Sequence, residues 1–110
     1  MRIRERRQER RVSLSRRATL LNGVDAFPCL LQDFTTRGFF IDTNQRFFVG
    51  QVLELRCELY PEQILTCRLE VKHINDTSIG TKIVDITPDG AKLLQQFLQE
   101  YYSLKLNQSI

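Results

Sequence analysis

The sequence predicts an all-β domain of short antiparallel strands followed by one C-terminal α-helix, arranged as a small barrel or closed sheet. Three observations predict this fold class. Apolar and polar residues alternate over residues 52–60 and again over 65–73, which is typical of half-buried strands. The pair Asn22-Gly23 favours a tight hairpin, because both residue types tolerate positive φ. Beyond residue 86 the apolar spacing changes to that of a helix.

The predicted strands are separated by short segments rich in turn-forming residues. They cover residues 18–21, about 26–33, 38–42, 52–60, 65–73 and 79–86. In the fourth strand the apolar side chains share one face, which we expect to point into the core. The fifth strand repeats this pattern and ends its apolar face with His73, so we expect a buried histidine there rather than a ligand or a catalyst.

The helix has a recognisable beginning. Thr87 suits the N-cap and Pro88 suits the first helical position. An apolar stripe then follows at Leu93, Leu94, Phe97, Leu98 and Tyr101. We expect this stripe to pack on the sheet, although a dimer interface would show the same pattern. Residues 105–110 are expected to fray.

The charge is distributed unevenly along the 110 residues, which suffice for one domain. Residues 1–17 carry a balance of +6, and the remainder carries −3. We therefore divide the chain into a flexible arginine-rich arm, residues 1–12, and a barrel with its helix, residues 13–110. Such an arm attracts phosphate groups of any kind.

The three cysteines, Cys29, Cys57 and Cys67, are odd in number and form no CxxC motif, so we expect reduced core residues in a cytoplasmic protein. No apolar run is long enough for a transmembrane helix, and residues 18–31 make a poor export signal. A metal site would need more than one histidine and closer cysteine spacing, so no metal is expected. We expect no cofactor.

Two short motifs carry the chemistry. The arm contains Arg7 and Arg11 in the spacing RxxxR, and Asp33, Thr35 and Gly38 form the pattern D-x-T-x-x-G between two predicted strands. In order and spacing this chain resembles the PilZ domain family of bacterial receptors for cyclic di-GMP. The resemblance implies a six-stranded antiparallel barrel with a C-terminal helix, which binds the ligand on its outer face. It extends to a glycine in the last strand, Gly80.

The residue types suit this ligand, which has two phosphates and two guanines. The arginine fork binds phosphate or the O6/N7 edge of guanine, whereas an ionised Asp33 accepts hydrogen bonds from the guanine N1 and N2 donors. Arg6 and Arg10 offer the same RxxxR spacing, and Arg6 would otherwise be the extra arginine before the motif. The family pattern favours serine where this chain has Thr35; the added methyl group would crowd the pocket.

The resulting prediction is a receptor or adaptor whose ligand-binding residues are Arg6, Arg7, Arg11, Asp33, Thr35 and Gly38. It would change conformation on binding cyclic di-GMP and relay the signal to a partner protein of unknown identity. No sensible catalytic set is present in the sequence, so we expect no enzyme. A PilZ-like protein-interaction module without nucleotide binding is the main alternative; a nucleic-acid binder and a phosphodiester-cleaving enzyme are less favoured.

The aromatic residues of the middle segment leave two interpretations open. These residues are Phe39, Phe40, Phe47 and Phe48. They are most simply core residues, but some of them would equally suit an exposed apolar patch that contacts a partner protein.

Overall fold

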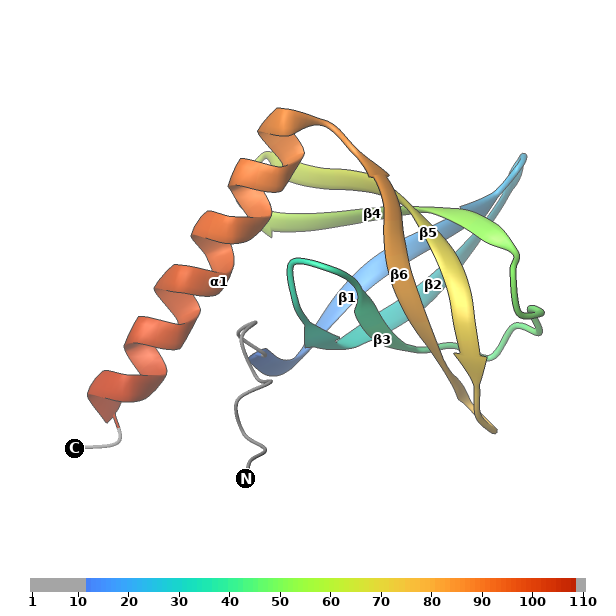
Figure 1. Cartoon of the computed structure of the whole chain (residues 1–110), viewed down its shortest axis with the longest axis horizontal. Helices are drawn as coiled ribbons and strands as arrows, with labels where there is room; N and C mark the ends of the chain where they lie inside the picture. The colour runs from blue at the N-terminus through green and yellow to red at the C-terminus, as the bar shows by residue number, and fades with distance from the viewer. Residues whose placement is uncertain (1–11, 109–110) are drawn as a thin grey trace, which may run out of the picture.

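A computed structural model describes residues 12–108 of the chain, and the side chains of residues 14–101. Six strands close into a barrel in the order β1-β2-β3-β6-β5-β4, and all neighbouring strands are antiparallel (Figure 1). The helix α1 follows the last strand and lies at one end of the barrel (Figure 1). The bounds are β1 (Val12–Asn22), β2 (Asp25–Phe34), β3 (Phe39–Asp42), β4 (Val52–Tyr60), β5 (Gln63–Ile74), β6 (Ser78–Ile86) and α1 (Pro88–Gln108). The predicted fold class is confirmed.

The first strand is much longer than predicted. It was expected over residues 18–21, but β1 begins at Val12. Arg16 faces the barrel interior from this strand, between Leu14 and Ala18. A charged residue on the inner face interrupts the apolar and polar alternation, so the sequence did not indicate a strand here. Beyond the strand, the hairpin loop consists of Gly23 and Val24 between the paired residues Asn22 and Asp25. The predicted hairpin is present, and of its two loop residues only Gly23 takes positive φ, +69°.

The alternation in β4 and β5 is confirmed. The buried faces of the two strands are formed by Leu53, Leu55, Cys57, Leu59, Leu65, Cys67, Leu69 and Val71. Each fully buried leucine contributes roughly 1.5–3 kcal/mol to folding. These side chains fill the barrel, so its interior is a packed core rather than a binding cavity.

His73 departs from the prediction. A shift of register between Val71 and His73 interrupts the pairing of β5 with β6. Such a bulge inserts one residue and reverses the side on which the following side chains emerge. His73 is therefore exposed instead of buried, and it lies opposite Gly80 on β6.

The helix begins as predicted. The Gly90 amide donates to the Thr87 hydroxyl over 3.0 Å, and the Ala91 amide donates to the Thr87 carbonyl over 2.9 Å. Thr87 is thus the N-cap, and Pro88 occupies the first helical position, where its missing N–H costs nothing. The helix continues to Gln108, past the point where fraying was expected. No helix in the described part of the chain is long and apolar enough to cross a membrane.

An aromatic cluster joins α1 to the barrel. The Phe97 ring lies 5.6 Å from the Phe34 ring and 5.8 Å from the Tyr60 ring, measured between centroids. The guanidinium of Arg16 lies 5.2 Å from the centre of the Phe97 ring, and its Nη2 donates to the Leu59 carbonyl over 2.8 Å. The apolar stripe of the helix therefore packs on the end of the barrel, as one of the two sequence interpretations expected.

The three cysteines are buried thiols, as predicted. Burial raises the thiol pKa from 9.0 to about 12 for Cys29 and Cys67. Burial also raises the pKa of Cys57, to about 11, although the positive charge of Arg16 lowers this pKa. At neutral pH the thiols are therefore protonated and poorly reactive while the barrel stays folded.

Raising the pH is accordingly expected to destabilise the barrel. The folded state holds the thiol protons more tightly than the unfolded state, so this stabilisation is complete below pH 9 and is lost as the pH rises through about 11 to 12. Urea unfolding under reducing conditions should show a lower free energy of unfolding at about pH 11 than at about pH 8. In a variant with all three cysteines replaced by alanine, the free energy of unfolding should fall less between about pH 8 and about pH 11. Rapid labelling of the native thiols at about pH 8 would contradict the expectation.

Candidate functional site

The turn between β2 and β3 is organised by the hydroxyl group of Thr35. This oxygen accepts hydrogen bonds from the amides of Arg37 and Gly38, each over 3.0 Å, and donates to the Gly38 carbonyl over 3.1 Å. The Thr35 amide donates to the same carbonyl over 3.0 Å. The hydroxyl group has one proton to donate, and this contact uses it. Thr35 thus shapes the turn, and its predicted contact with a ligand stays a prediction.

Gly38 is required here for a reason that the sequence did not indicate. Its φ is outside the left-handed region, which among the described residues only Gly23, Gly50 and Glu62 occupy. A Cβ atom on Gly38 would overlap the carbonyl oxygen of Thr81 and stand 2.9 Å from its carbon. The glycine therefore permits close contact between the turn and the backbone of β6.

Hydrogen bonds hold the turn and β6 together on either side of this contact. The Ile83 amide donates to the Arg37 carbonyl over 2.6 Å. The Thr81 hydroxyl donates to the Phe39 carbonyl over 2.9 Å and accepts from the Phe39 amide over 3.3 Å. The D-x-T-x-x-G turn is therefore fixed on the outside of the barrel.

A surface hollow of about 380 Å³ lies between this turn and the strands beside it. Its volume is within the range of roughly 300–1,000 Å³ that small-molecule pockets occupy. The lining residues come from the end of β2, the turn, β3, β5 and β6. They are Asp33, Thr35, Arg37, Gly38, Phe39, Phe40, Lys72, His73, Gly80, Thr81 and Lys82. The hollow thus brings together three predicted site residues and the glycine of the last strand.

Positive charge predominates around the hollow. Arg37, Lys72 and Lys82 outnumber the one carboxylate, Asp33, and His73 adds an imidazole. The site therefore suits an anionic ligand that also presents hydrogen-bond donors to a carboxylate.

The arginines of the predicted site, Arg6, Arg7 and Arg11, lie outside the described residues. The described chain begins at Val12, which is paired with Phe34, and the next residue, Ser13, is paired with Asp33. Arg11 precedes Val12 directly in the sequence. The arm is thus attached beside the carboxylate of the motif, whereas attachment at the far end of the barrel would have separated them.

Apart from Gly80, sequence reasoning missed the β5 and β6 residues of the hollow. Lys72 and Lys82 belong to neither motif, and His73 was assigned to the core. Arg37, which lies between motif positions, is exposed and also lines the hollow. The bulge before His73 has no signature in the sequence, so only the strand register could place these side chains at the site.

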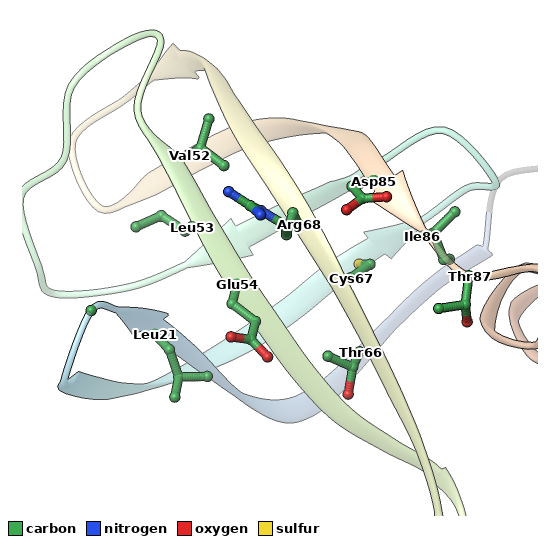
Figure 2. Close-up of a pocket in the computed structure, with 11 residues that line it drawn as sticks. Leu21, Val52, Leu53, Glu54, Thr66, Cys67, Arg68, Asp85, Ile86 and Thr87 are labelled. Atoms are coloured by element: carbon green, nitrogen blue, oxygen red, sulfur yellow. The ribbon is translucent and has the colours of Figure 1, made fainter.

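A second hollow, of about 420 Å³, lies nearer the other ends of β5 and β6 (Figure 2). Across its strands Glu54 is paired with Arg68, and Arg68 with Asp85. The charges here alternate in sign, and the apolar side chains Leu21 and Val52 flank them (Figure 2). It contains no residue of either motif, so the first hollow is the stronger candidate.

The family is decided by comparison with known sequences. The model of the PilZ domain family matches residues 5–100, which span both motifs and the whole barrel. The chain belongs to the PilZ domain family. A comparison with curated proteins found no match. The resemblance inferred from Arg7, Arg11 and the Asp33–Gly38 motif is therefore confirmed at the level of the family.

Solved PilZ structures share the fold at low sequence identity. The PilZ domain of Escherichia coli YcgR, solved with cyclic di-GMP, aligns with a TM-score of 0.76 and 11% identity, over 96% of this chain and 98% of that one. The PilZ domain of CeSA from a cellulose-synthesising bacterium aligns with a TM-score of 0.69 and 9% identity, over 84% of this chain and 98% of that one.

A third structure extends beyond this chain. The inhibitor of motility MotI/DgrA of Bacillus subtilis aligns with a TM-score of 0.80 and 18% identity, over 96% of this chain. The aligned part is 54% of the Bacillus chain, so this PilZ protein spans about half of that structure.

Proposed function

We propose that this PilZ protein is a receptor for cyclic di-GMP that acts as an adaptor and catalyses no reaction. The observation that supports the proposal most directly is the pairing of Ser13 with Asp33. It attaches the arginine-rich arm beside the cationic hollow that the D-x-T-x-x-G turn helps to line. The YcgR PilZ domain, which has this fold, was solved with the same ligand.

The proposed binding mode divides the ligand between the arm and the hollow. Arg7 and Arg11 bind phosphate oxygens or a guanine edge, since the guanidinium presents a fork of donors. Asp33 accepts from N1 and N2 of a guanine in the hollow. Each charge-assisted hydrogen bond contributes about 1.5–3 kcal/mol, whereas ordering an arm costs about 2–5 kcal/mol, so several contacts must form together.

The signal follows from closure of the arm over the hollow. Binding covers the exposed charges of the hollow and replaces them with a surface made of arm and ligand. A partner protein that distinguishes these two surfaces would associate with one and not the other. MotI is an inhibitor of motility, and a protein of the motility machinery is therefore one class of partner.

Calorimetric titration with cyclic di-GMP tests the proposal. We expect saturable heat, together with protection of the amides of residues 5–12 from hydrogen exchange. A protein-interaction module without nucleotide binding would give neither signal. The observation that favours this alternative is the exposed pair Phe48 and Val49 in the loop between β3 and β4, at 66% and 61% exposure.

Alanine substitutions of Arg7, Arg11 and Asp33 are expected to weaken the binding of cyclic di-GMP. Arg7→Ala and Arg11→Ala should each lower the affinity for cyclic di-GMP at least about tenfold, since each removes charge-assisted hydrogen bonds. Asp33→Ala should lower the affinity for cyclic di-GMP more than it lowers the affinity for a simple polyanion such as polyphosphate. The ligand-free melting temperature should change little for the arginine variants.

The control is Arg56→Ala, because Arg56 is an exposed arginine on β4 that pairs with Glu54 over 3.4 Å. Its affinity should match that of the wild type. Arg6→Ala and Arg10→Ala determine the register of the arginine pair, since a larger loss at these positions would shift the motif by one residue. Equal losses for cyclic di-GMP and polyphosphate in Asp33→Ala would argue against guanine recognition.

A further inference from the structure

The far wall of the candidate site carries side chains that neither motif includes. This wall is formed by β5 and β6 and contributes Lys72, His73, Gly80 and Lys82 to the hollow. It faces Asp33 at the end of β2 and Thr35 in the turn that follows. A ligand in the hollow would therefore contact both walls.

His73 occupies this wall because of two local features. The bulge after Val71 turns its side chain outwards, and the strand register then places it opposite Gly80. A Cβ atom at Gly80 would stand 3.3 Å from the His73 Cδ2 atom and 3.6 Å from its Cβ atom. The imidazole thus lies against a position without a side chain, and its ring is accessible from the hollow.

Lys82 lies at the junction between the wall and the turn. Its Cα would be 3.0 Å from a Cβ atom on Gly38, so the lysine backbone touches the turn itself. Lys72 forms an ion pair with Glu70 over 3.7 Å, whereas Lys82 forms no ion pair with any residue that the structure describes. Of the two lysines, Lys82 is the one whose charge is available to a ligand.

We propose that His73 and Lys82 form a second ligand-binding wall, in which the imidazole stacks on a purine base and the ammonium group binds a phosphate. The proposal rests on the function proposed above. Asp33 on the near wall accepts from the edge of the base, so the flat face of that base is left for a planar side chain of the opposite wall. Imidazole is one of the rings that stack on unpaired bases, and lysine binds phosphate as a point charge.

Titration calorimetry with cyclic di-GMP, using four variants of the full chain, tests both roles. His73→Ala should weaken binding about tenfold or more, whereas His73→Phe, which keeps a flat ring, should stay within about threefold of the wild type. Lys82→Gln should weaken binding about tenfold at low salt and less at high salt. Lys92→Gln, a matched exposed lysine on α1, should bind like the wild type.

Each outcome separates this inference from the function on which it rests. If the wild type binds and Arg11→Ala does not, but His73→Ala and Lys82→Gln bind normally, the second wall is refuted and the receptor function stands. If His73→Phe loses as much affinity as His73→Ala, stacking is refuted. A wild type that gives no heat refutes both proposals. Melting temperatures of the ligand-free variants, expected to be unchanged because His73 and Lys82 are exposed, confirm that each variant is folded.

Discussion

Replacing Gly38 by alanine is expected to lower the free energy of unfolding by about 3 kcal/mol and to abolish cyclic di-GMP binding. The added Cβ atom would overlap the Thr81 carbonyl oxygen and stand 3.0 Å from the Lys82 Cα atom. Both are backbone atoms, so no rotation of a side chain relieves the overlap. The turn must instead move away from β6.

Movement of the turn would break the hydrogen bonds that surround the contact. The Ile83 amide, now 2.6 Å from the Arg37 carbonyl, would lose its acceptor, and the contacts of Thr81 with Phe39 would lengthen. Asp33 and the β6 cation Lys82 would then no longer face one another across the hollow. Stability and binding are lost together because the same contact supports both.

Urea unfolding and calorimetry measure the two effects, with Gly50→Ala as the control. Gly50 has a φ of +95° and nothing within 4 Å of its Cβ position, so alanine there adds backbone strain without overlap. That strain costs about 1 kcal/mol and should leave binding intact. A Gly38→Ala variant as stable as Gly50→Ala would contradict the assignment of Gly38 to close packing against β6.

The glycine shows what sequence reasoning could and could not provide. The motif predicted a turn between two strands, and the turn is there. The reason for the glycine is a contact with Thr81 on a distant strand, which local propensity does not reveal. Gly38 does not use positive φ, so close packing and not conformational freedom is what this position requires.

The strands were predictable where one face is buried and the other exposed. Alternation in β4 and β5 and the N-cap at Thr87 are strong local signals, and the structure agrees with both. The alternation pattern predicted the wrong side for a residue where a tertiary contact or a bulge decides which way its side chain points. Arg16 faces inwards because its charge reaches the Leu59 carbonyl and the Phe97 ring, and His73 faces outwards because of a bulge.

The candidate site was predictable on one wall only. Asp33, Thr35 and Gly38 belong to a contiguous motif, and they line the hollow. Lys82 and His73 belong to strands that meet the motif only when the barrel closes through the pairing of β3 with β6. Neighbours created by closure in this way have no spacing rule in the sequence.

The second large effect is expected at the junction between the helix and the barrel, where Phe97 is 6% exposed. Phe97 contacts three aromatic rings, with centroid distances of 5.6 Å to Phe34, 5.8 Å to Tyr60 and 6.2 Å to Tyr101. It also covers the guanidinium of Arg16, whose Nε is buried without a hydrogen-bond partner among the described residues. The ring therefore fills the end of the barrel and shields a charge.

Phe97→Ala should lower the free energy of unfolding by about 4 kcal/mol, since it removes a large buried ring and leaves a cavity beside a cation. Phe97→Leu should lose less, because it keeps most of the apolar volume. Urea unfolding followed by far-ultraviolet circular dichroism measures the loss. Gln95→Ala, an exposed change on the same helix, should alter stability by less than about 0.5 kcal/mol. If Phe97→Ala costs less than about 1 kcal/mol, α1 does not fold cooperatively with the barrel, and the Arg16 contact is incidental.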